Sequence, residues 1–459
     1  MKFLLVRPVS DTYIISPPIG LGYIATAIRK TGVNPHILDC VKERLTLTGF
    51  KKFIETFNAD IVGFQVWSCD ALQVKQSLKI IKESNKKTII IIGGAHPSGD
   101  PKGSLEYFTE ADFGFRGEGE RGITLFIEKL LGDDSIKLDI IPGLIWRSNG
   151  KIYYNGLSLV TDLDSIGIPA WDLIPPSRYP YAPHQGFAKA FPIAPIIITR
   201  GCPFDCSFCA SHSINGRKVR FRTISHVLEE MALLKNEYGV KEFHIEDDNF
   251  TINKYLVKEF CKKLITESID TYWHCSSGIR LDSLDIDTLR LMKDSGCYTF
   301  TVAIESGTNR VLKLMQKNLT VMTVRKQINM MNRAGCKPTG LFMIGFPGET
   351  RNEIRKTIKF AKNLDIKRAQ FAIFHPMPGS KIWDELKKQG RLKGLDWSKI
   401  KPSEVAYTSE IPAKELKRFQ RKAFVTFHLR PKILWYQLRE INSWENLLYI
   451  LKRIISMLS

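Results

Sequence analysis

The first 130 residues alternate between short apolar runs and longer stretches whose apolar positions recur at helical spacing. The apolar runs are four to seven residues long, as expected for strands that are covered on both faces. The predicted strands are Phe3–Val6, His36–Asp39, Ile61–Trp67, Thr88–Ile92 and Phe113–Arg116. The helical stretches between them include Leu21–Lys30, Ala71–Glu83 and Gly122–Leu131. This order predicts a doubly wound parallel α/β sheet, a Rossmann-like fold that binds ligands at the carboxyl ends of its strands.

A second alternating series begins at Ile196. Helical stretches such as His226–Tyr238 and Arg351–Leu364 separate its apolar runs. The predicted strands are Ile196–Arg200, Glu242–Glu246, Tyr272–Ser276, Thr299–Ile304, Gly340–Ile344 and Gln370–Phe374. Six βα units predict a partial (βα)6 TIM barrel, with its site at the carboxyl ends of the strands.

The segments outside the two series complete the predicted domain organisation. Residues 143–154 read as a hairpin that turns at Ser148-Asn149-Gly150, and residues 168–195 are rich in proline. The predicted domains are an α/β domain over residues 1–135, a hairpin and proline-rich linker over 136–192, the partial barrel over 193–390, and a basic, aromatic, helical region over 391–459.

The last region has two interpretations. Residues 414–430 and 435–457 combine aromatic and basic side chains at helical spacing. Such helices can lie on an anionic membrane surface. The favoured interpretation is a helical cap that closes the open barrel and packs its apolar face inward.

Composition and charge bear on the cellular compartment and on the partners that we expect for this protein. The formal net charge of +20 is spread along a lysine-rich chain, so solvated surface lysines explain it without nucleic acid. The sequence shows no apolar run of transmembrane length and no signal peptide. Nine cysteines, an odd number with three close together, favour thiolate–metal chemistry over disulfides. We therefore expect a cytoplasmic protein; the alternative is peripheral contact with the inner face of the membrane through the C-terminal region.

Three cysteines on one loop carry the strongest chemical signal. Cys202, Cys206 and Cys209 follow an apolar strand with C-x₃-C-x₂-C spacing. Structural zinc sites and closed iron–sulfur clusters use four protein ligands, whereas three thiolates leave one iron of a cubane open to another ligand. The alternative is a zinc site that His212 completes.

This loop resembles the signature of radical S-adenosylmethionine enzymes. The resemblance implies a 4Fe–4S cluster whose open iron binds the methionine moiety of S-adenosylmethionine, and reductive cleavage that yields a 5′-deoxyadenosyl radical. Further segments at successive strand ends match the family, namely IEDDNF at 245–250, SGIR at 277–280, IESG at 304–307 and GLFMIGFPGET at 340–350. The S-adenosylmethionine contacts that the resemblance implies are Phe208, Glu246, Asp247, Arg280, Glu305, Gly345 and Pro347.

The first domain resembles the cobalamin-binding domain that precedes many radical S-adenosylmethionine modules. The matching segments are PPIGLG at 17–22, VGF at 62–64, GGAHP at 93–97 and RGEGE at 116–120. The cobalamin contacts that the resemblance implies are Pro18, Gly22, Gly93, Gly94, His96, Gly117 and Glu118. Domains that supply a histidine to cobalt carry Asp-x-His-x-x-Gly, and here Gly94 replaces the aspartate. A ligand histidine normally needs such an orienting acceptor, so the sequence favours cobalt without a bond to His96.

The two resemblances together imply a cobalamin-dependent radical enzyme, similar to class B radical methyltransferases and to anaerobic magnesium-protoporphyrin ester cyclases. The first hypothesis is methylation of an unactivated carbon in a small-molecule or lipid-like substrate. The second is an oxidative cyclase or rearrangement enzyme with the same cofactors, and the third is a cobalamin or redox sensor that binds nucleic acid. No DNA-reading motif is visible, so nucleic acid is not an expected partner. A low-potential electron donor such as flavodoxin or ferredoxin is expected.

Overall fold

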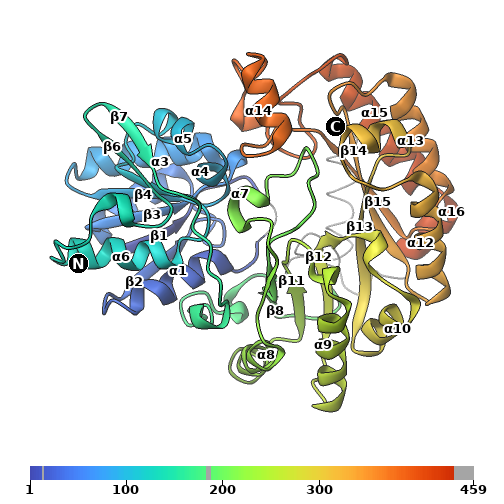
Figure 1. Ribbon diagram of the computed structural model, residues 1–459, viewed down its shortest axis with the longest axis horizontal. Coiled ribbons are helices and arrows are strands. Elements are labelled where there is room, and N and C mark those ends of the chain that lie inside the picture. The colour runs from blue at the N-terminus through green and yellow to red at the C-terminus, as the bar shows by residue number, and fades with distance from the viewer. Residues whose placement is uncertain (13–14, 182–187, 439–459) are drawn as a thin grey trace.

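Two β-sheets with their covering helices stand side by side in the computed structural model (Figure 1). The structure describes residues 1–12, 15–181 and 188–438. The first sheet has the strand order β2-β1-β3-β4-β5-β6-β7, and its first five strands are parallel. These strands are β1 (Phe3–Arg7), β2 (Pro35–Asp39), β3 (Ile61–Gln65), β4 (Ile89–Gly93) and β5 (Phe113–Phe115). The strand order reverses between β1 and β3, which creates a topological switch point at the carboxyl edge.

Helices cover both faces of the first sheet, as the apolar runs predict. Side chains of β1 alternate between two hydrophobic clusters, with Phe3 and Leu5 in one and Leu4 and Val6 in the other. Helices α1 (Ile19–Arg29) and α6 (Glu120–Leu130) pack on the first cluster. The second cluster is covered by α2 (Leu47–Phe57), α3 (Ala71–Ser84) and α5 (Pro101–Tyr107); the short α4 (Ala95–Gly99) follows β4.

The predicted hairpin forms and extends this sheet. Its strands are β6 (Leu144–Ser148) and β7 (Lys151–Tyr154), and the turn residue Asn149 has a φ of 50°. Strand β6 pairs antiparallel with β5, so the hairpin belongs to the first sheet as an antiparallel edge.

The second sheet contains six parallel strands in sequence order, as the partial barrel predicts (Figure 1). They are β8 (Ile193–Ile196), β11 (Glu242–Ile245), β12 (Tyr272–Ile279), β13 (Cys297–Glu305), β14 (Pro338–Ile344) and β15 (Arg368–Ile373). The connecting helices include α8 (Ile224–Tyr238), α9 (Lys254–Thr266), α10 (Ile286–Asp294), α11 (Asn309–Leu314), α12 (Val321–Arg333) and α13 (Arg351–Asn363). One hydrophobic cluster unites α8, α9, α10, α12 and α13 with the strands, whereas Val311 of α11 belongs to a separate cluster.

The first barrel strand ends earlier than the sequence predicts. The run 196–200 was expected to form it, but β8 stops at Ile196. The carboxylate of Asp247 accepts hydrogen bonds from the amides of Ile198 and Thr199, both at 2.8 Å, and so takes those amides away from the strand ladder. Thr199–Arg200 (β9) instead pairs antiparallel with Arg220–Phe221 (β10).

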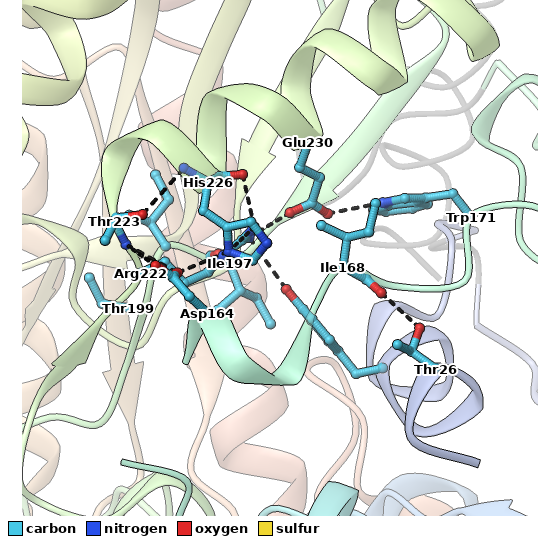
Figure 2. A network of polar contacts seen from close by, with 12 residues as sticks. Thr26, Asp164, Ile168, Trp171, Ile197, Thr199, Arg222, Thr223, His226 and Glu230 are labelled. Atoms are coloured by element: carbon cyan, nitrogen blue, oxygen red, sulfur yellow. Dashed lines mark hydrogen bonds and ion pairs between the residues drawn. The ribbon is translucent and has the colours of Figure 1, made fainter. Parts of the chain in front are cut away.

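The proline-rich linker packs between the two sheets through buried polar contacts (Figure 2). The Trp171 indole nitrogen donates to Glu230 at 2.9 Å, and the guanidinium of Arg222 donates to the other oxygen of Glu230 at 2.5 Å. Asp164 of the linker pairs with His226 at 2.9 Å. Thr26 of the first domain donates to the Ile168 carbonyl of the linker at 2.7 Å, so the linker ties helix α8 of the barrel to the first domain.

The C-terminal region caps the open edge of the barrel in the part that the structure describes. Helix α15 (Ala413–His428) lies against β15 and α13, and buries Leu416, Phe419, Ala423 and Phe427 in the barrel cluster. A shorter helix, α16 (Pro431–Leu438), follows it; the rest of the helix predicted over 435–457 lies outside the described residues. The inward apolar face confirms the cap interpretation for α15. Within residues 1–12, 15–181 and 188–438, no helix is long and apolar enough to span a bilayer.

A substitution in α15 tests this cap. Replacing Phe427, which is fully buried, by alanine should lower the free energy of unfolding by about 3–5 kcal/mol, because a large ring leaves a cavity behind. Leu429 is 63% exposed, so Leu429→Ala should change it by less than about 0.5 kcal/mol. Denaturant titration measures both values. Equal, small effects of the two substitutions would contradict the cap, as would salt-sensitive binding of the wild-type protein to anionic vesicles.

Candidate active site

The three predicted cluster cysteines lie on one loop, residues 201–219, between β9 and β10. Gly201 opens this loop with a φ of 99°, and a side chain there would lie 2.5 Å from the Lys218 carbonyl oxygen. Asp248, at the end of β11, accepts hydrogen bonds from the Gly201 amide at 3.2 Å and from the Asn215 side chain at 2.8 Å. These contacts fix the loop at the carboxyl end of the barrel, where the sequence predicts the site.

The three loop cysteines do not form a compact zinc site in this structure. Within residues 1–12, 15–181 and 188–438, the only three His, Cys, Asp or Glu ligand atoms within 4.8 Å of one another belong to Glu242, His244 and His274. At least one pair of the loop sulfurs is therefore further apart than the roughly 3.8 Å that tetrahedral zinc with Zn–S bonds of about 2.3 Å imposes. His212 begins the short helix α7 (His212–Asn215) after the loop and does not complete such a site.

Burial makes the loop thiols weak acids. It raises the pKa of Cys209 to about 12, with smaller contributions from Asp248 and the other two cysteines. Burial also raises the pKa of Cys202 and Cys206, and Lys317 opposes the rise at Cys206. Only thiolates bind iron, so cluster assembly must release these protons.

The adjacent carboxylates Glu246 and Asp247, which follow β11, have different hydrogen-bond partners. Both oxygens of Asp247 accept backbone hydrogen bonds, and burial raises the pKa of this carboxyl group to about 7. Asp247 therefore shapes the start of the cysteine loop. Glu246 accepts a hydrogen bond from the Ser277 hydroxyl at 3.1 Å. Of the two predicted S-adenosylmethionine contacts here, Glu246 has fewer protein partners.

Arg280 is held firmly at the end of β12. Its guanidinium donates to Asp282 at 2.6 and 3.1 Å and to the carbonyls of Lys317 and Asn318 at 3.0 and 3.1 Å. The same group lies over the ring of Phe204 in the cysteine loop, 3.8 Å from its centroid. Arg280 thus braces the loop, and most of its donors are engaged.

A buried ion pair beside the loop includes a residue that the sequence analysis missed. Lys317 donates to Glu305 at 3.0 Å, and both side chains are less than 10% exposed. Glu305 ends β13 with a φ of 67°, an uncommon value for a residue other than glycine. The ammonium group lies 5.7 Å from the ring centroid of Phe208, a predicted S-adenosylmethionine contact. Burial opposes the charged ammonium, but Glu305 and Cys206 outweigh it and raise the pKa of Lys317.

The turn after β14 has the tight geometry that its glycines predict. Gly345 has a φ of 81°, and a side chain there would lie 3.0 Å from Leu416 of α15. The Gly345 amide donates to Glu349 at 2.7 Å, while burial raises the pKa of Glu349 to about 8. Pro347 lies half-buried in the same turn. This turn joins the cap to the carboxyl end of the barrel.

The first domain has open space at its carboxyl edge. A side chain at Gly93, the end of β4, would meet no atom within 4 Å. Trp67 follows β3 and is 49% exposed. Gly94 has a φ of 105° and lies close to the Val66 backbone, a position that needs glycine. An open glycine edge beside an exposed indole, at the topological switch point, fits a broad flat ligand such as cobalamin.

His96 is enclosed by protein. Its side chain is 3% exposed, its Nδ1 lies 3.0 Å from the Ser68 hydroxyl, and its ring contacts Phe108 and Trp397. Burial lowers the pKa of His96 to about 4, so the ring is neutral at physiological pH. Because the ring is 3% exposed and Nδ1 contacts Ser68, little of the imidazole is accessible for an axial bond to cobalt.

Of the remaining predicted cobalamin residues, Gly22, Gly117 and Glu118 contact the linker, and Pro18 caps its own helix. Pro18 precedes α1, and its carbonyl accepts from the amides of Leu21 and Gly22. A side chain at Gly22 would lie 2.8 Å from atoms of Pro169 and Ile174. Gly117 forms a β-bridge with Ser158, and Glu118 pairs with arginines of the barrel. The linker and the barrel, rather than an open edge, surround Gly22, Gly117 and Glu118.

Segments that follow the carboxyl ends of both sheets meet. A side chain at Gly99, the end of α4, would lie 2.1 Å from the Pro378 carbonyl after β15. A side chain at Gly379 would lie 2.6 Å from the Ser213 hydroxyl in α7. Trp397 completes this junction by packing on His96. The two predicted cofactor edges therefore share one interface.

The compact Glu242, His244 and His274 cluster has a structural explanation. Glu242 accepts hydrogen bonds from the amides of Lys189 and Ala190 at 2.7 and 2.9 Å. It also accepts from Tyr298 at 2.6 Å and lies 2.8 Å from the His244 ring nitrogen. A carboxylate with four neighbours of this kind has little capacity left for a metal ion, so the cluster anchors the end of the linker inside the barrel.

The packing of His96 yields a spectroscopic prediction. In protein loaded with cobalamin, the electron paramagnetic resonance spectrum of cob(II)alamin should lack the nitrogen splitting that an axial histidine causes. His96→Ala should leave that spectrum unchanged, because the imidazole is packed between Ser68, Phe108 and Trp397. Nitrogen splitting in the wild type that disappears in His96→Ala would refute the prediction.

Comparison with known proteins identifies both domains. The chain matches the Radical SAM superfamily over residues 196–361 and the B12 binding domain over residues 9–126. It is 33% identical to an uncharacterized methyltransferase of Pyrococcus horikoshii over 99% of this chain and 97% of that protein. It is 30% identical to the cytidylyl-2-hydroxyethylphosphonate methyltransferase of Streptomyces wedmorensis, covering 85% of this chain and 82% of the relative. The radical S-adenosylmethionine methyltransferase TsrM of Kitasatospora setae superposes with a TM-score of 0.68 at 17% identity, covering 84% of this chain and 76% of TsrM.

Proposed function

We propose that this chain, which belongs to the cobalamin-dependent radical S-adenosylmethionine methyltransferase family, methylates an unactivated carbon of a small organic substrate. Its cofactors are a 4Fe–4S cluster, S-adenosylmethionine and cobalamin. The observation that carries the proposal is the junction of Gly99 with Pro378 and Gly379, which brings the carboxyl-end segments of the two domains together.

The pairing of the two domains favours carbon as the acceptor. S-adenosylmethionine is an electrophile, and a carbon without a lone pair does not attack it directly. When bound, the cluster supplies the electron that cleaves S-adenosylmethionine, and cobalamin supplies a methyl group that a carbon-centred radical can accept. Fusion of the two domains in one chain is explained if the reaction needs both.

The residues of the barrel would bind and orient the reactants. In the proposed arrangement, Cys202, Cys206 and Cys209 hold three irons and leave the fourth open. Glu246 accepts a hydrogen bond from the methionine ammonium group, as a carboxylate at this strand end can. Glu305 accepts from the ribose hydroxyls, and Lys317 supplies a buried positive charge beside it. Asp247, Asp248 and Arg280 keep the loop in place.

The residues of the first domain would bind cobalamin at its carboxyl edge. Gly93, Gly94 and Trp67 form the proposed contact surface, with no axial histidine. The electron donor in this proposal is a low-potential protein such as flavodoxin or ferredoxin, which titanium(III) citrate replaces in vitro.

An isotope experiment tests the proposal. Anaerobic, fully loaded protein receives S-adenosylmethionine with a trideuterated methyl group, together with polar and lipid extracts as substrate sources. The expected result is a compound that gains one trideuteromethyl group, with 5′-deoxyadenosine and S-adenosylhomocysteine formed in equal amounts. The Cys209→Ala variant is the control and should form none of the three.

Two outcomes would contradict methyl transfer to carbon. Turnover that gives 5′-deoxyadenosine and an oxidised product without S-adenosylhomocysteine would favour the cyclase hypothesis. Full activity of protein that lacks cobalamin would refute both enzymatic hypotheses.

A further inference from the structure

The RGEGE segment at 116–120 joins the first domain to the arginines that flank the cysteine loop. Glu118 pairs with Arg220 through contacts of 2.7 and 2.8 Å. Glu120 pairs with Arg200 at 2.7 Å, and Arg200 also lies 3.6 Å from Glu118. Two carboxylates of one domain thus meet two guanidinium groups of the other.

The two arginines lie at the two ends of the cysteine loop. Arg200 directly precedes Gly201, the first residue of the loop, and Arg220 directly follows the loop. The two arginines are paired residues of the short β9–β10 ladder. The network therefore holds both ends of the segment that carries all three cluster cysteines.

The four side chains of the network are buried, and Arg220 makes further hydrogen bonds to the backbone. Each of the four side chains is at most 10% exposed. Arg220 also donates to the carbonyls of Val160 and Asn215, both at 2.6 Å. Such a charge-balanced set holds one geometry well, because any displacement leaves a buried charge without its partner.

We propose that Glu118 and Glu120 are positioning residues that set the distance between the cobalamin edge of the first domain and the cysteine loop. This inference rests on the proposed function and deepens it. It assigns the acidic residues of the segment to alignment of the two cofactors instead of direct contact with cobalamin. Reaction steps within the barrel should depend little on this alignment, whereas a step that crosses between the domains should depend on it strongly.

Two products of S-adenosylmethionine distinguish a step within the barrel from a step that crosses between the domains, and both products form without a methyl-accepting substrate. Cleavage to 5′-deoxyadenosine takes place within the barrel. One electron from the reductant breaks the carbon–sulfur bond and releases methionine, and a second electron with a proton from water converts the 5′-deoxyadenosyl radical to 5′-deoxyadenosine. Transfer of the methyl group to cob(I)alamin crosses the interface. There the carbon–sulfur bond breaks, a carbon–cobalt bond forms with the electron pair of cobalt, and S-adenosylhomocysteine leaves.

The experiment compares fully loaded wild type with Glu118→Gln, Glu120→Gln and the double variant, reduced by titanium(III) citrate and given S-adenosylmethionine alone. We expect S-adenosylhomocysteine formation to fall about tenfold or more, while 5′-deoxyadenosine formation changes less than about twofold. The magnetic coupling between the reduced cluster and cob(II)alamin should weaken, with unchanged iron and cobalamin content. Lys387→Met is the matched control, since it breaks the exposed interdomain pair with Asp100. It should change none of these values.

The proposal is overturned if both products fall in proportion to cofactor content, or if S-adenosylhomocysteine formation and magnetic coupling stay at wild-type values in the double variant. If the wild type itself forms no S-adenosylhomocysteine, the proposed methyl transfer fails. The magnetic coupling then still decides the positioning role, because it compares distances between loaded cofactors and needs no turnover.

Discussion

Anaerobically reconstituted protein should lose its 4Fe–4S cluster completely when Cys202, Cys206 or Cys209 is replaced by alanine. The loop offers three thiolates for a cluster with four irons, so removal of one leaves two irons without a protein ligand. Iron and sulfide analysis and the visible absorption of the cluster measure the loss. Formation of 5′-deoxyadenosine should fall below detection in all three variants.

The matched control is a cysteine elsewhere in the barrel. Cys261 lies in α9 and is fully buried in the hydrophobic cluster. Cys261→Ala should keep the full iron content, because the thiol there only fills space. Tetrahedral zinc in place of iron, or a cluster that survives in any of the three loop variants, would disprove the assignment.

The strand series was predictable because each strand carries a local signal. Strand β4 is the run Ile89–Gly93, and its parallel neighbours are equally apolar. Such runs predict strands covered on both faces, and the structure confirms them. The end of β8 was not predictable from local pattern, because Asp247, 49 residues from Ile198, removes the next amides from the ladder.

Apart from Phe208 in the cysteine loop, the predicted S-adenosylmethionine contacts lie at strand ends of the barrel, but the sequence does not distinguish the surroundings of each residue. Glu246 and Asp247 are adjacent carboxylates in the same segment, and the sequence treats them alike. The structure gives Asp247 two backbone donors, whereas the partners of Glu246 are the serine hydroxyls of Ser276 and Ser277. Such a difference depends on tertiary contacts, which no single segment of sequence contains.

The glycines of the first domain show the same limit. A glycine at a strand end can admit a ligand or another part of the chain. Gly93 has open space around it, whereas Gly22 admits Pro169 and Ile174 of the linker. The partner of Gly22 lies about 150 positions further along the chain. No pattern near Gly22 indicates it.

Lys317 was missed because its sequence context looks like surface. It lies in Met315-Gln316-Lys317-Asn318 of a chain whose net charge is +20, where most lysines are solvated. Its two neighbours, Gln316 and Asn318, both have positive φ values, of 51° and 52°. The turn they make buries the lysine against Glu305 and the cysteine loop. The polar turn Gln316–Asn318, which follows helix α11, is the sequence feature that marks this position.

Replacement of Lys317 by methionine should weaken S-adenosylmethionine binding and slow its cleavage by about a hundredfold. Methionine keeps the length and apolar stem of the side chain but removes the charge. The variant leaves Glu305 buried without its cation, and loss of one partner of a buried pair costs about 3–5 kcal/mol. The proposed ribose contact of Glu305 and the charge balance beside Cys206 are then both disturbed.

The measurements are equilibrium binding of S-adenosylmethionine to reconstituted protein, the rate of 5′-deoxyadenosine formation, and the change in the cluster's electron paramagnetic resonance spectrum when S-adenosylmethionine is added. Lys313 is the matched control, because it is an exposed lysine of the neighbouring helix α11. Lys313→Met should match the wild type in all three.

The double variant Glu305→Gln with Lys317→Met separates charge balance from direct recognition. If Lys317 only neutralises Glu305, the double variant should bind S-adenosylmethionine as tightly as Glu305→Gln alone. If the ammonium group also acts on the ligand or on the cluster thiolates, the double variant should bind more weakly than Glu305→Gln alone. Two observations favour the second outcome. Cys206 raises the pKa of Lys317, and the ammonium nitrogen lies 5.7 Å from the centroid of the Phe208 ring. Wild-type affinity and spectra in Lys317→Met itself would exclude any role of this lysine at the site.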